Sequence, residues 1–158
     1  MNKITHLDDT GRPRIVDVTN KSITARRAVA RGRVVFSKDA FAQVANGRSA
    51  KGDIARIAEL AGIGGVKQTA AIIPLCHPLS LTGIDVVVEP DEAENAFIVT
   101  ATVKTDAKTG VEMEALTGVA TACLTIYDMT KAIDKSISIE AIELIEKTGG
   151  KSGDFKRG

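Results

Sequence analysis

Tryptophan is absent from this chain of 158 residues, which contains one tyrosine and four phenylalanines. Proteins that bind single-stranded nucleic acid stack bases on aromatic side chains, and so few aromatic residues argue against such a platform. A large excess of charge of either sign is also missing, since the formal net charge is +1. The composition therefore disfavours a strongly basic nucleic-acid binder, and any attraction for anions must be local.

Cysteine is scarce as well, because Cys76 and Cys123 are the two cysteines and no Cys-x-x-Cys motif occurs. Neither an iron–sulfur cluster, nor a zinc ribbon, nor a disulfide framework is indicated. The sequence begins with polar residues and lacks a long apolar run, so we expect a cytoplasmic protein without a secretory signal or membrane span. A hydrophobic share of 44% predicts one domain over residues 1–158, with a flexible arm over about residues 1–13 and a flexible tail over about residues 148–158.

The stretch from Gly110 to Lys135 predicts a helix that has no charge in its middle. No charged residue occurs between Ala115 and Tyr127, whereas a solvated helix face would carry lysine and glutamate. Apolar residues at helical spacing form one side, and small residues form the other. The first side comprises Leu116, Val119, Ala120, Cys123, Ile126, Tyr127, Thr130 and Ile133, and the second comprises Gly118, Thr121, Ala122, Thr125 and Ala132. We expect this helix to be buried against a sheet and a further partner.

The order of the remaining elements predicts a ferredoxin-like α+β domain, with βαββαβ connectivity, an antiparallel sheet, helices on one face and an extra N-terminal segment. Ser37 and Asp53 are the expected N-caps of two helices, and Pro74 is expected to close the second helical region. Predicted strands span residues 14–21, 22–36, 79–89, 96–105 and 136–147, and predicted helices span 38–46, 54–71 and 110–135. The uncovered face of the sheet would need the N-terminal segment or another subunit.

Two short motifs offer groups for anion binding and proton transfer. Lys51 precedes a predicted helix start, where free N–H groups and the helix dipole favour a phosphate, although a solvated loop lysine explains the same tripeptide. Histidine is the side chain that ordinarily titrates near neutrality, so His77 suits an acid, a base or a phosphate donor, with a packed histidine as the alternative. Neighbouring Cys76 and His77 side chains rarely face each other, which disfavours a nucleophilic dyad.

Charged residues bracket the uncharged helix. Thr109 and Glu112 have the spacing of a capping box, and Glu114 lies where the helix dipole favours a negative charge. Asp128 and Lys131 are three residues apart, close enough for a surface ion pair. Lys147 and Lys151 lie beside or within a glycine-rich tail that could close over an anion, although solvated lysines are the simpler explanation.

The two ends of this helix are too far apart to act on one reacting centre. Glu114 and Asp128 are fourteen residues apart, which corresponds to about 21 Å along a helix axis. If two copies of the helix packed antiparallel through Gly118, Thr121 and Thr125, the first turn of one would approach the last turn of the other. We therefore expect a homo-oligomer whose sites are shared between subunits.

Several motifs, taken together, resemble the cyclic pyranopterin monophosphate synthase family of molybdenum cofactor biosynthesis. Each motif is weak alone, but their order and spacing are specific, and the similarity extends from Thr5 to the tail. The motifs are KGD at 51–53, AGI at 61–63, LCHPL at 75–79, TGVEMEALT at 109–117, YDM at 127–129, KA at 131–132 and GGKSG at 149–153.

This resemblance implies a ferredoxin-like lyase that converts a cyclised dihydroguanosine triphosphate to cyclic pyranopterin monophosphate and releases pyrophosphate. It also implies a homohexamer, built as a trimer of dimers, with the site at the dimer interface. The implied catalytic residues are Lys51, His77, Asp128 and Lys131, and the implied substrate-binding residues are Asp17, Arg26, Leu75, Cys76, His77, Glu112, Met113, Glu114 and Lys147. No cofactor is implied, and a magnesium ion carried by the triphosphate would leave no motif.

The inventory of side chains suits this chemistry, and we hypothesise individual roles. Asp128 would be the general base, while Lys51 and Lys131 would hold phosphate or act as acid. The carboxylates of Glu112 and Glu114 would bind the guanidine-like edge of the ring system.

Two departures from the family pattern stand out. Thr130 replaces a common cysteine and should be a packing change, and Gly64-Gly65 replaces small alanines, at about 1 kcal/mol of helix stability per glycine. Three other functions stay open: a hydrolase or transferase with Cys76 as nucleophile, a nucleotide-sensing regulatory domain without turnover, and an oligomeric scaffold.

Overall fold

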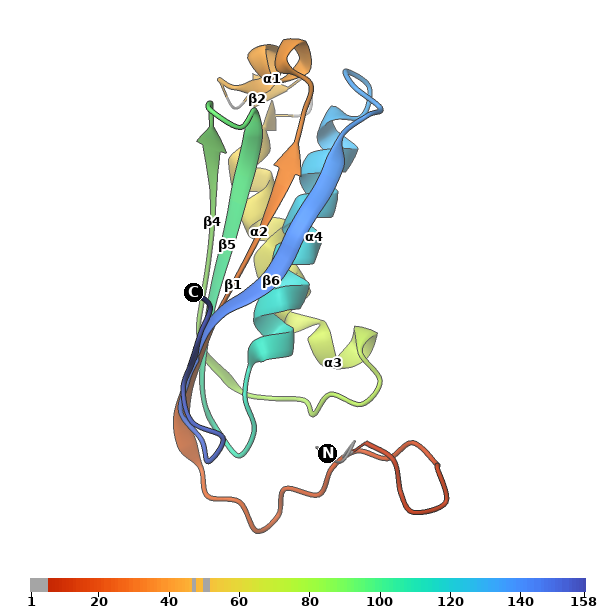
Figure 1. Ribbon diagram of the computed structural model, residues 1–158, viewed down its shortest axis with the longest axis vertical. Helices are drawn as coiled ribbons and strands as arrows, with labels where there is room; N and C mark the ends of the chain where they lie inside the picture. Colours follow the sequence, from red (N-terminus) through yellow and green to blue (C-terminus); the bar gives the residue numbers. More distant parts are fainter. Residues whose placement is uncertain (1–5, 47, 50–51) are drawn as a thin grey trace.

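The computed structural model describes residues 6–46, 48–49 and 52–158, and its centre is a five-stranded antiparallel sheet. Across the sheet the strands are β4 (Leu81–Asp91), β5 (Ala96–Ala107), β1 (Thr24–Val35), β6 (Ser138–Thr148) and β7 (Phe155–Lys156). The helices α2 (Ile54–Lys67) and α4 (Glu112–Thr130) cover one face of it (Figure 1). The chain order β1, α2, β4, β5, α4, β6 is the βαββαβ order expected from the sequence.

Alternation of side chains along β1 builds the core beneath the helices. Ala28, Ala30 and Val34 are buried on the helix side, as the period of two requires for a strand with one covered face. At one end of the sheet Phe36, Phe41 and Phe97 form an aromatic cluster with ring centroids 5.7 to 6.0 Å apart. The short helix α1 (Lys38–Val44) contributes Phe41, and its N-cap is Ser37, whose hydroxyl accepts from the N–H of Ala40 as predicted.

The helix α4 is buried, as expected, but the partner of its small side is α2 of the same chain. A side chain at Gly118 would come within 2.5 Å of Val66, and a Cβ at Gly65 would lie 2.2 Å from the hydroxyl of Thr121. The two helices therefore touch almost backbone to backbone. The predicted antiparallel packing of two α4 copies through Gly118, Thr121 and Thr125 is wrong at Gly118 and Thr121, because α2 already occupies those positions.

Several local predictions also need correction. Residues 14–21, predicted as a strand, form none, and residues 155–156 of the tail form β7 at the sheet edge beside β6. The predicted second helix is divided into α2 and the short α3 (Thr69–Ile72). Two more short strands, β2 (Arg48–Ser49) and β3 (Gly52–Asp53), pair before α2, where Asp53 is the N-cap as predicted. None of the helices in the described residues is long and apolar enough to span a membrane.

The predicted capping box at the start of α4 does not form. The N-cap is Val111, which lacks a side-chain acceptor, and the helix begins at Glu112 itself. The Glu112 carboxylate turns instead toward β6, where Nζ of Lys147 donates to its Oε1 over 2.9 Å. This residue is thereby available to a site, since its side chain is not used for capping.

Candidate active site

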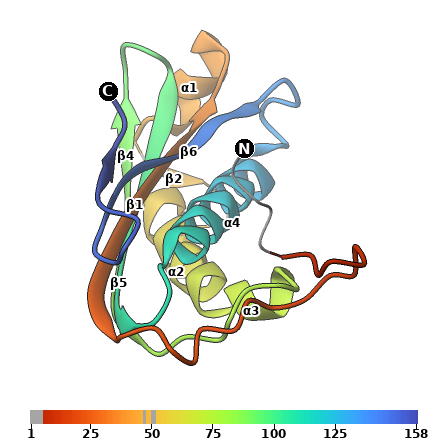
Figure 2. The same cartoon turned by 60° about the horizontal axis from the view of Figure 1, so that its bottom comes forward.

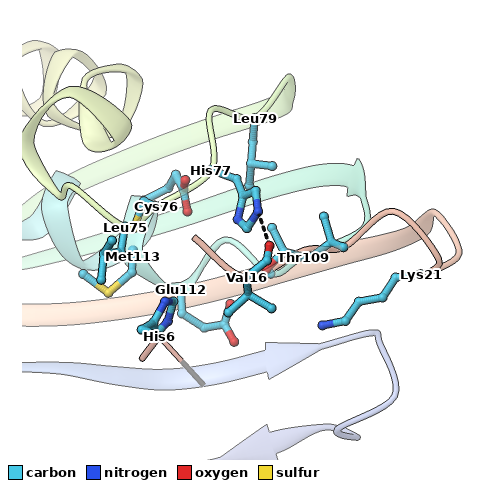
Figure 3. Close-up of a pocket in the computed structure, with 13 residues that line it drawn as sticks. His6, Val16, Lys21, Leu75, Cys76, His77, Leu79, Thr109, Glu112 and Met113 are labelled. Atoms are coloured by element: carbon cyan, nitrogen blue, oxygen red, sulfur yellow. Dashed lines mark hydrogen bonds between the residues drawn. The ribbon is translucent and has the colours of Figure 1, made fainter. Parts of the chain in front are cut away.

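Two adjoining cavities open at the end of the molecule where α4 begins. The first has a volume of about 390 Å³ and lies between the N-terminal arm, which here comprises the described residues 6–23 before β1, the segment from α3 to β4 and the first turn of α4 (Figure 3). The second has a volume of about 570 Å³ and lies between the start of β1, the β5–α4 loop and the turn after β6. They share four lining residues, Lys21, Thr109, Gly110 and Glu112, and so form a continuous depression.

The segment before β4 presents His77 to the first cavity. A turn from Ile73 to Cys76 is closed by a backbone bond of 3.1 Å, with Pro74 in the second position that suits its fixed φ. Pro78 restricts His77 to an extended conformation. The half-buried imidazole then reaches the arm, where its Nε2 lies 2.8 Å from the carbonyl oxygen of Val16 (Figure 3).

Glu114 is the buried acid of the first cavity. Its side chain is 5% exposed, and burial, with a smaller contribution from the nearby charge of Glu112, raises its pKa above the ordinary value. The first turn of α4 fixes its place, because Glu112 and Glu114 both lie there. A carboxyl group held in this way can donate a hydrogen bond or a proton at a pH where an exposed glutamate could not.

Cys76 lines the same cavity but is poorly suited to nucleophilic attack. Burial raises the pKa of its thiol, and the charge of Glu114 raises it further. The thiolate is the reactive form of cysteine, so this environment suppresses reactivity. The raised pKa of the thiol disfavours the hydrolase or transferase alternative that uses Cys76 as nucleophile.

The second cavity is strongly cationic. Lys147 is held there by the Glu112 carboxylate, and both side chains are about three-quarters buried, with exposures of 25% and 29%. Glu112 is the one carboxylate among the lining residues, whereas five side chains are cationic. The five are Lys21, Arg26, Lys108, Lys147 and Lys151. Such a concentration of positive charge in a chain of nearly zero net charge is electrostatically suited to a polyanion.

Arg26 is fixed by main-chain groups rather than by an acid. Its Nε donates to the carbonyl of Ala107 over 3.0 Å, and its Nη2 donates to that of Lys108 over 3.2 Å. Gly150 has a φ of +87°, and a Cβ there would lie 2.2 Å from Nη1 of Arg26. Glycine is therefore required for the turn after β6 to pack on the guanidinium, which keeps its charge unneutralised by a described carboxylate.

The structure brings together most of the residues predicted from the sequence. Glu112 borders both cavities, and Asp17 lies between Val16 and Val18 of the arm, with its Oδ1 accepting from the N–H and hydroxyl of Thr19. The first cavity is lined by Leu75, Cys76, His77, Glu112, Met113 and Glu114, and the second by Arg26, Glu112 and Lys147.

The other predicted cluster lies at the far end of α4 (Figure 1). Lys131 and Asp128 form the predicted ion pair, with Nζ 2.7 Å from Oδ1, and both side chains are more than half exposed. Hydrogen bonding to Asp128 raises the pKa of Lys131. One subunit therefore does not bring Asp128 to Glu114. Lys51 lies outside the described residues.

Sequence reasoning placed Asp17 of the arm in the site but missed three other arm residues and two lysines of the cationic cavity. His6, Val16 and Val18 line the first cavity, and none of them was predicted as a site residue. Lys21 and Lys108 meet because β1 and β5 pair with Thr24 opposite Ala107, so that residues before β1 and after β5 emerge together. The register of this strand pair, read from the alternating pattern, is the signal that could have found them.

Comparisons with known proteins identify the family of this chain. A family model described as the MoaC family matches residues 15–150. A protein of Heliobacterium modesticaldum is 54% identical over 157 residues, covering 99% of both chains, and one of Chloroflexus aurantiacus is 53% identical over 156 residues, covering 99% of this chain and 96% of the other. A protein of Thermomicrobium roseum is 51% identical over 157 residues, covering 99% and 95%. All three are named cyclic pyranopterin monophosphate synthase. This chain belongs to the MoaC family.

Proposed function

We propose that the chain converts a cyclised dihydroguanosine triphosphate to cyclic pyranopterin monophosphate, with release of pyrophosphate, in molybdenum cofactor biosynthesis. The observation that carries the proposal is the junction of the two cavities at Glu112. One side offers an imidazole and a protonatable buried carboxyl, and the other offers cations. A substrate that joins a purine-derived ring to a triphosphate can place its ring in the first cavity and its phosphates in the second.

The cationic cavity is the proposed place of the phosphates. Lys147, Arg26 and Lys151 can neutralise the charge that develops on pyrophosphate as it leaves, an effect that is strongest when the donors are already in position. Magnesium carried by the substrate's phosphates remains part of the proposal, because Mg²⁺ usually takes phosphate oxygens, waters and one or two carboxylates as ligands. Among the described residues no group of three or more histidines, cysteines or acids could hold a metal ion.

The first cavity is the proposed place of the ring system. Glu112 and Glu114 can bind the guanidine-like edge, and His77 can transfer protons during ring opening and closure. The raised pKa of Glu114 suits a carboxyl that is protonated for part of this cycle.

We further propose that the complete site is shared between identical chains, in a hexamer built from three dimers. Asp128 and Lys131, proposed as general base and as phosphate holder or acid, lie at the opposite end of α4 from the two cavities. A second copy can supply them to this end. Leu60 and Leu124, which are 71% and 60% exposed on the two long helices, support an assembly that covers the helix layer.

The direct experiment is incubation of the purified protein with the cyclised dihydroguanosine triphosphate. We expect pyrophosphate release together with a pterin that becomes fluorescent after oxidation, and loss of both in Asp128→Asn. Tight binding of the nucleotide without either product would favour the nucleotide-sensing regulatory alternative.

A second experiment tests the place of the phosphates. Lys151→Ala should weaken competitive inhibition by inorganic triphosphate about threefold to tenfold, because a charge-assisted contact is lost. Lys156→Ala is the matched control, since Lys156 lies in the same tail, on β7, but does not line the cationic cavity. Equal inhibition constants for the two variants would show that the phosphates bind outside the cationic cavity.

A further inference from the structure

The N-terminal arm forms a wall of the ring cavity, which is the first cavity and the proposed place of the ring system. The main chain of the arm contacts His77. Val16 (Figure 3) and Val18 line the cavity. The arm runs alongside the segment that leads from α3 to β4 (Figure 2). The imidazole Nε2 lies 2.8 Å from the Val16 carbonyl oxygen, although 61 residues separate the two in sequence.

The chemistry of this contact decides where the proton of His77 lies. A backbone carbonyl can accept a hydrogen bond but cannot donate one, so Nε2 must carry the hydrogen. In the neutral imidazole the lone pair is then on Nδ1. Within the described part of the chain, Nδ1 has no hydrogen-bond partner.

The arm is held in place by bonds that do not involve His77. The Oδ1 of Asp17 accepts from the N–H and the hydroxyl of Thr19, at 2.8 and 2.6 Å. Nζ of Lys108, at the end of β5, donates to the Thr19 carbonyl over 2.7 Å, and the N–H of Lys21 donates to the Val18 carbonyl over 3.0 Å. The Val16 carbonyl is therefore presented to the imidazole by a turn that is already formed.

We propose that the Val16 carbonyl is a positioning group that fixes His77 in the Nε2–H tautomer, so that Nδ1 is the nitrogen that exchanges a proton with the substrate. When Nδ1 takes a proton, the imidazolium keeps its Nε2–H bond to Val16, and the ring does not rotate between accepting the proton and returning it. Asp17 supports this carbonyl indirectly, because its side chain accepts the two hydrogen bonds from Thr19 that hold the turn of the arm. The proposal rests on the proposed function in that His77 transfers a proton during turnover.

The tautomer can be read without any turnover. The chain contains two histidines, His6 and His77, so ¹⁵N-histidine labelling gives two imidazoles, and the spectrum of His6→Gln assigns them. We expect His77 in its neutral form to show a protonated Nε2 and an unprotonated Nδ1. A protonated Nδ1, or rapid averaging of the two tautomers in the full-length protein, would overturn the proposal whatever the enzyme's activity.

The contribution of this hydrogen bond to catalysis can be tested by making the Val16 carbonyl a poorer acceptor. Replacing Asp17 with the corresponding α-hydroxy acid keeps its side chain but converts the Val16 carbonyl to an ester carbonyl, a poorer acceptor. The matched control is an α-hydroxy acid in place of Ile15, which lines neither cavity, so that the Arg14 carbonyl two residues before Val16 is altered instead. Circular dichroism confirms that both variants are folded.

We expect the ester at residue 17 to lower kcat about threefold to tenfold with KM little changed, because one neutral hydrogen bond is weakened. It should also raise the population of the Nδ1–H tautomer of His77. The control ester should change neither quantity. Equal effects of the two esters, or a lower kcat with an unchanged tautomer population, would show that the arm acts as a wall and not through the imidazole.

Discussion

Nζ of Lys147 lies 2.9 Å from Oε1 of Glu112, so the last long strand and the first turn of α4 meet at the boundary between the two cavities. The ion pair is partly shielded from water, and its lysine also donates to the hydroxyl of Ser152 over 3.3 Å. This contact links the ring cavity to the glycine-rich turn that packs on Arg26.

A double-mutant cycle of Lys147→Met and Glu112→Gln measures this link. We expect a coupling of about 0.5 to 1 kcal/mol in the free energy of unfolding, because the pair keeps about a quarter of its exposure and salt still screens it. In turnover, Lys147→Met should lower kcat/KM by about tenfold or more, since a polyanion contact is lost. Chemical denaturation and steady-state kinetics provide the two measurements. A kcat/KM equal to that of Lys156→Met would contradict the assignment of Lys147 to the phosphates.

Mixing of inactive subunits tests the shared site. Glu112→Ala and Asp128→Asn chains are each expected to be inactive alone. If they are dissociated and reassembled together, about a quarter of the wild-type rate should return. Half of the randomly formed dimers are then mixed, and one of the two sites in each mixed dimer keeps both clusters intact. Equal amounts of each variant, reassembled separately, are the controls, and a mixture as inactive as the controls argues for a site within one chain.

Two neighbouring glycines in α2 should respond in opposite ways to alanine. Gly64 has nothing within 4 Å of an added Cβ, so Gly64→Ala should stabilise the protein by about 0.5 to 1 kcal/mol through helix propensity. Gly65→Ala should destabilise it by about 1 to 3 kcal/mol, because the methyl group would collide with Thr121. Thermal or urea unfolding of the pair provides the comparison. Similar shifts in both variants would contradict the close packing of α2 on α4.

The raised pKa of Glu114 predicts a pH-dependent stability. In the unfolded chain a glutamate has a pKa of about 4.3. Burial raises the pKa of Glu114 in the folded state, so it stays protonated to higher pH. The folded state then binds more protons, so the free energy of unfolding should decrease as pH rises through the interval between the two values. Glu114→Gln should lose this decrease, and urea unfolding across the interval measures it. An unchanged pH profile in the variant would show that Glu114 is charged in the fold.

Local patterns in the sequence predicted much of the architecture. Alternation predicted the strands around β1, and the acceptor side chains of Ser37 and Asp53 predicted the starts of α1 and α2, because each of these signals depends on neighbours in the chain. The predicted capping box does not form, because a contact with a residue distant in the chain outweighs the local signal. Thr109 and Glu112 have the right spacing, but the helix begins at Glu112, which bonds to Lys147 from a distant strand.

The site was less predictable, because tertiary contacts decide it. The small side of α4 indicated a close helix neighbour but did not identify α2, since either α2 or a second copy would suit Gly118 and Thr121. Motifs identified His77 and the acids through the family resemblance. The arm carbonyl of Val16 has no residue type to mark it, as any amino acid would present the same group.

The glycine-lined contact between α2 and α4 fixes the length of α4. An ideal α-helix rotates by about 100° per residue, so one residue inserted or deleted between Gly118 and Asp128 would turn one end out of alignment with the other. A bulky side chain would then replace a glycine or alanine against Gly62, where even a Cβ is crowded. Insertions in this family should therefore be found in the loops and termini, while the register of α4 is kept residue for residue.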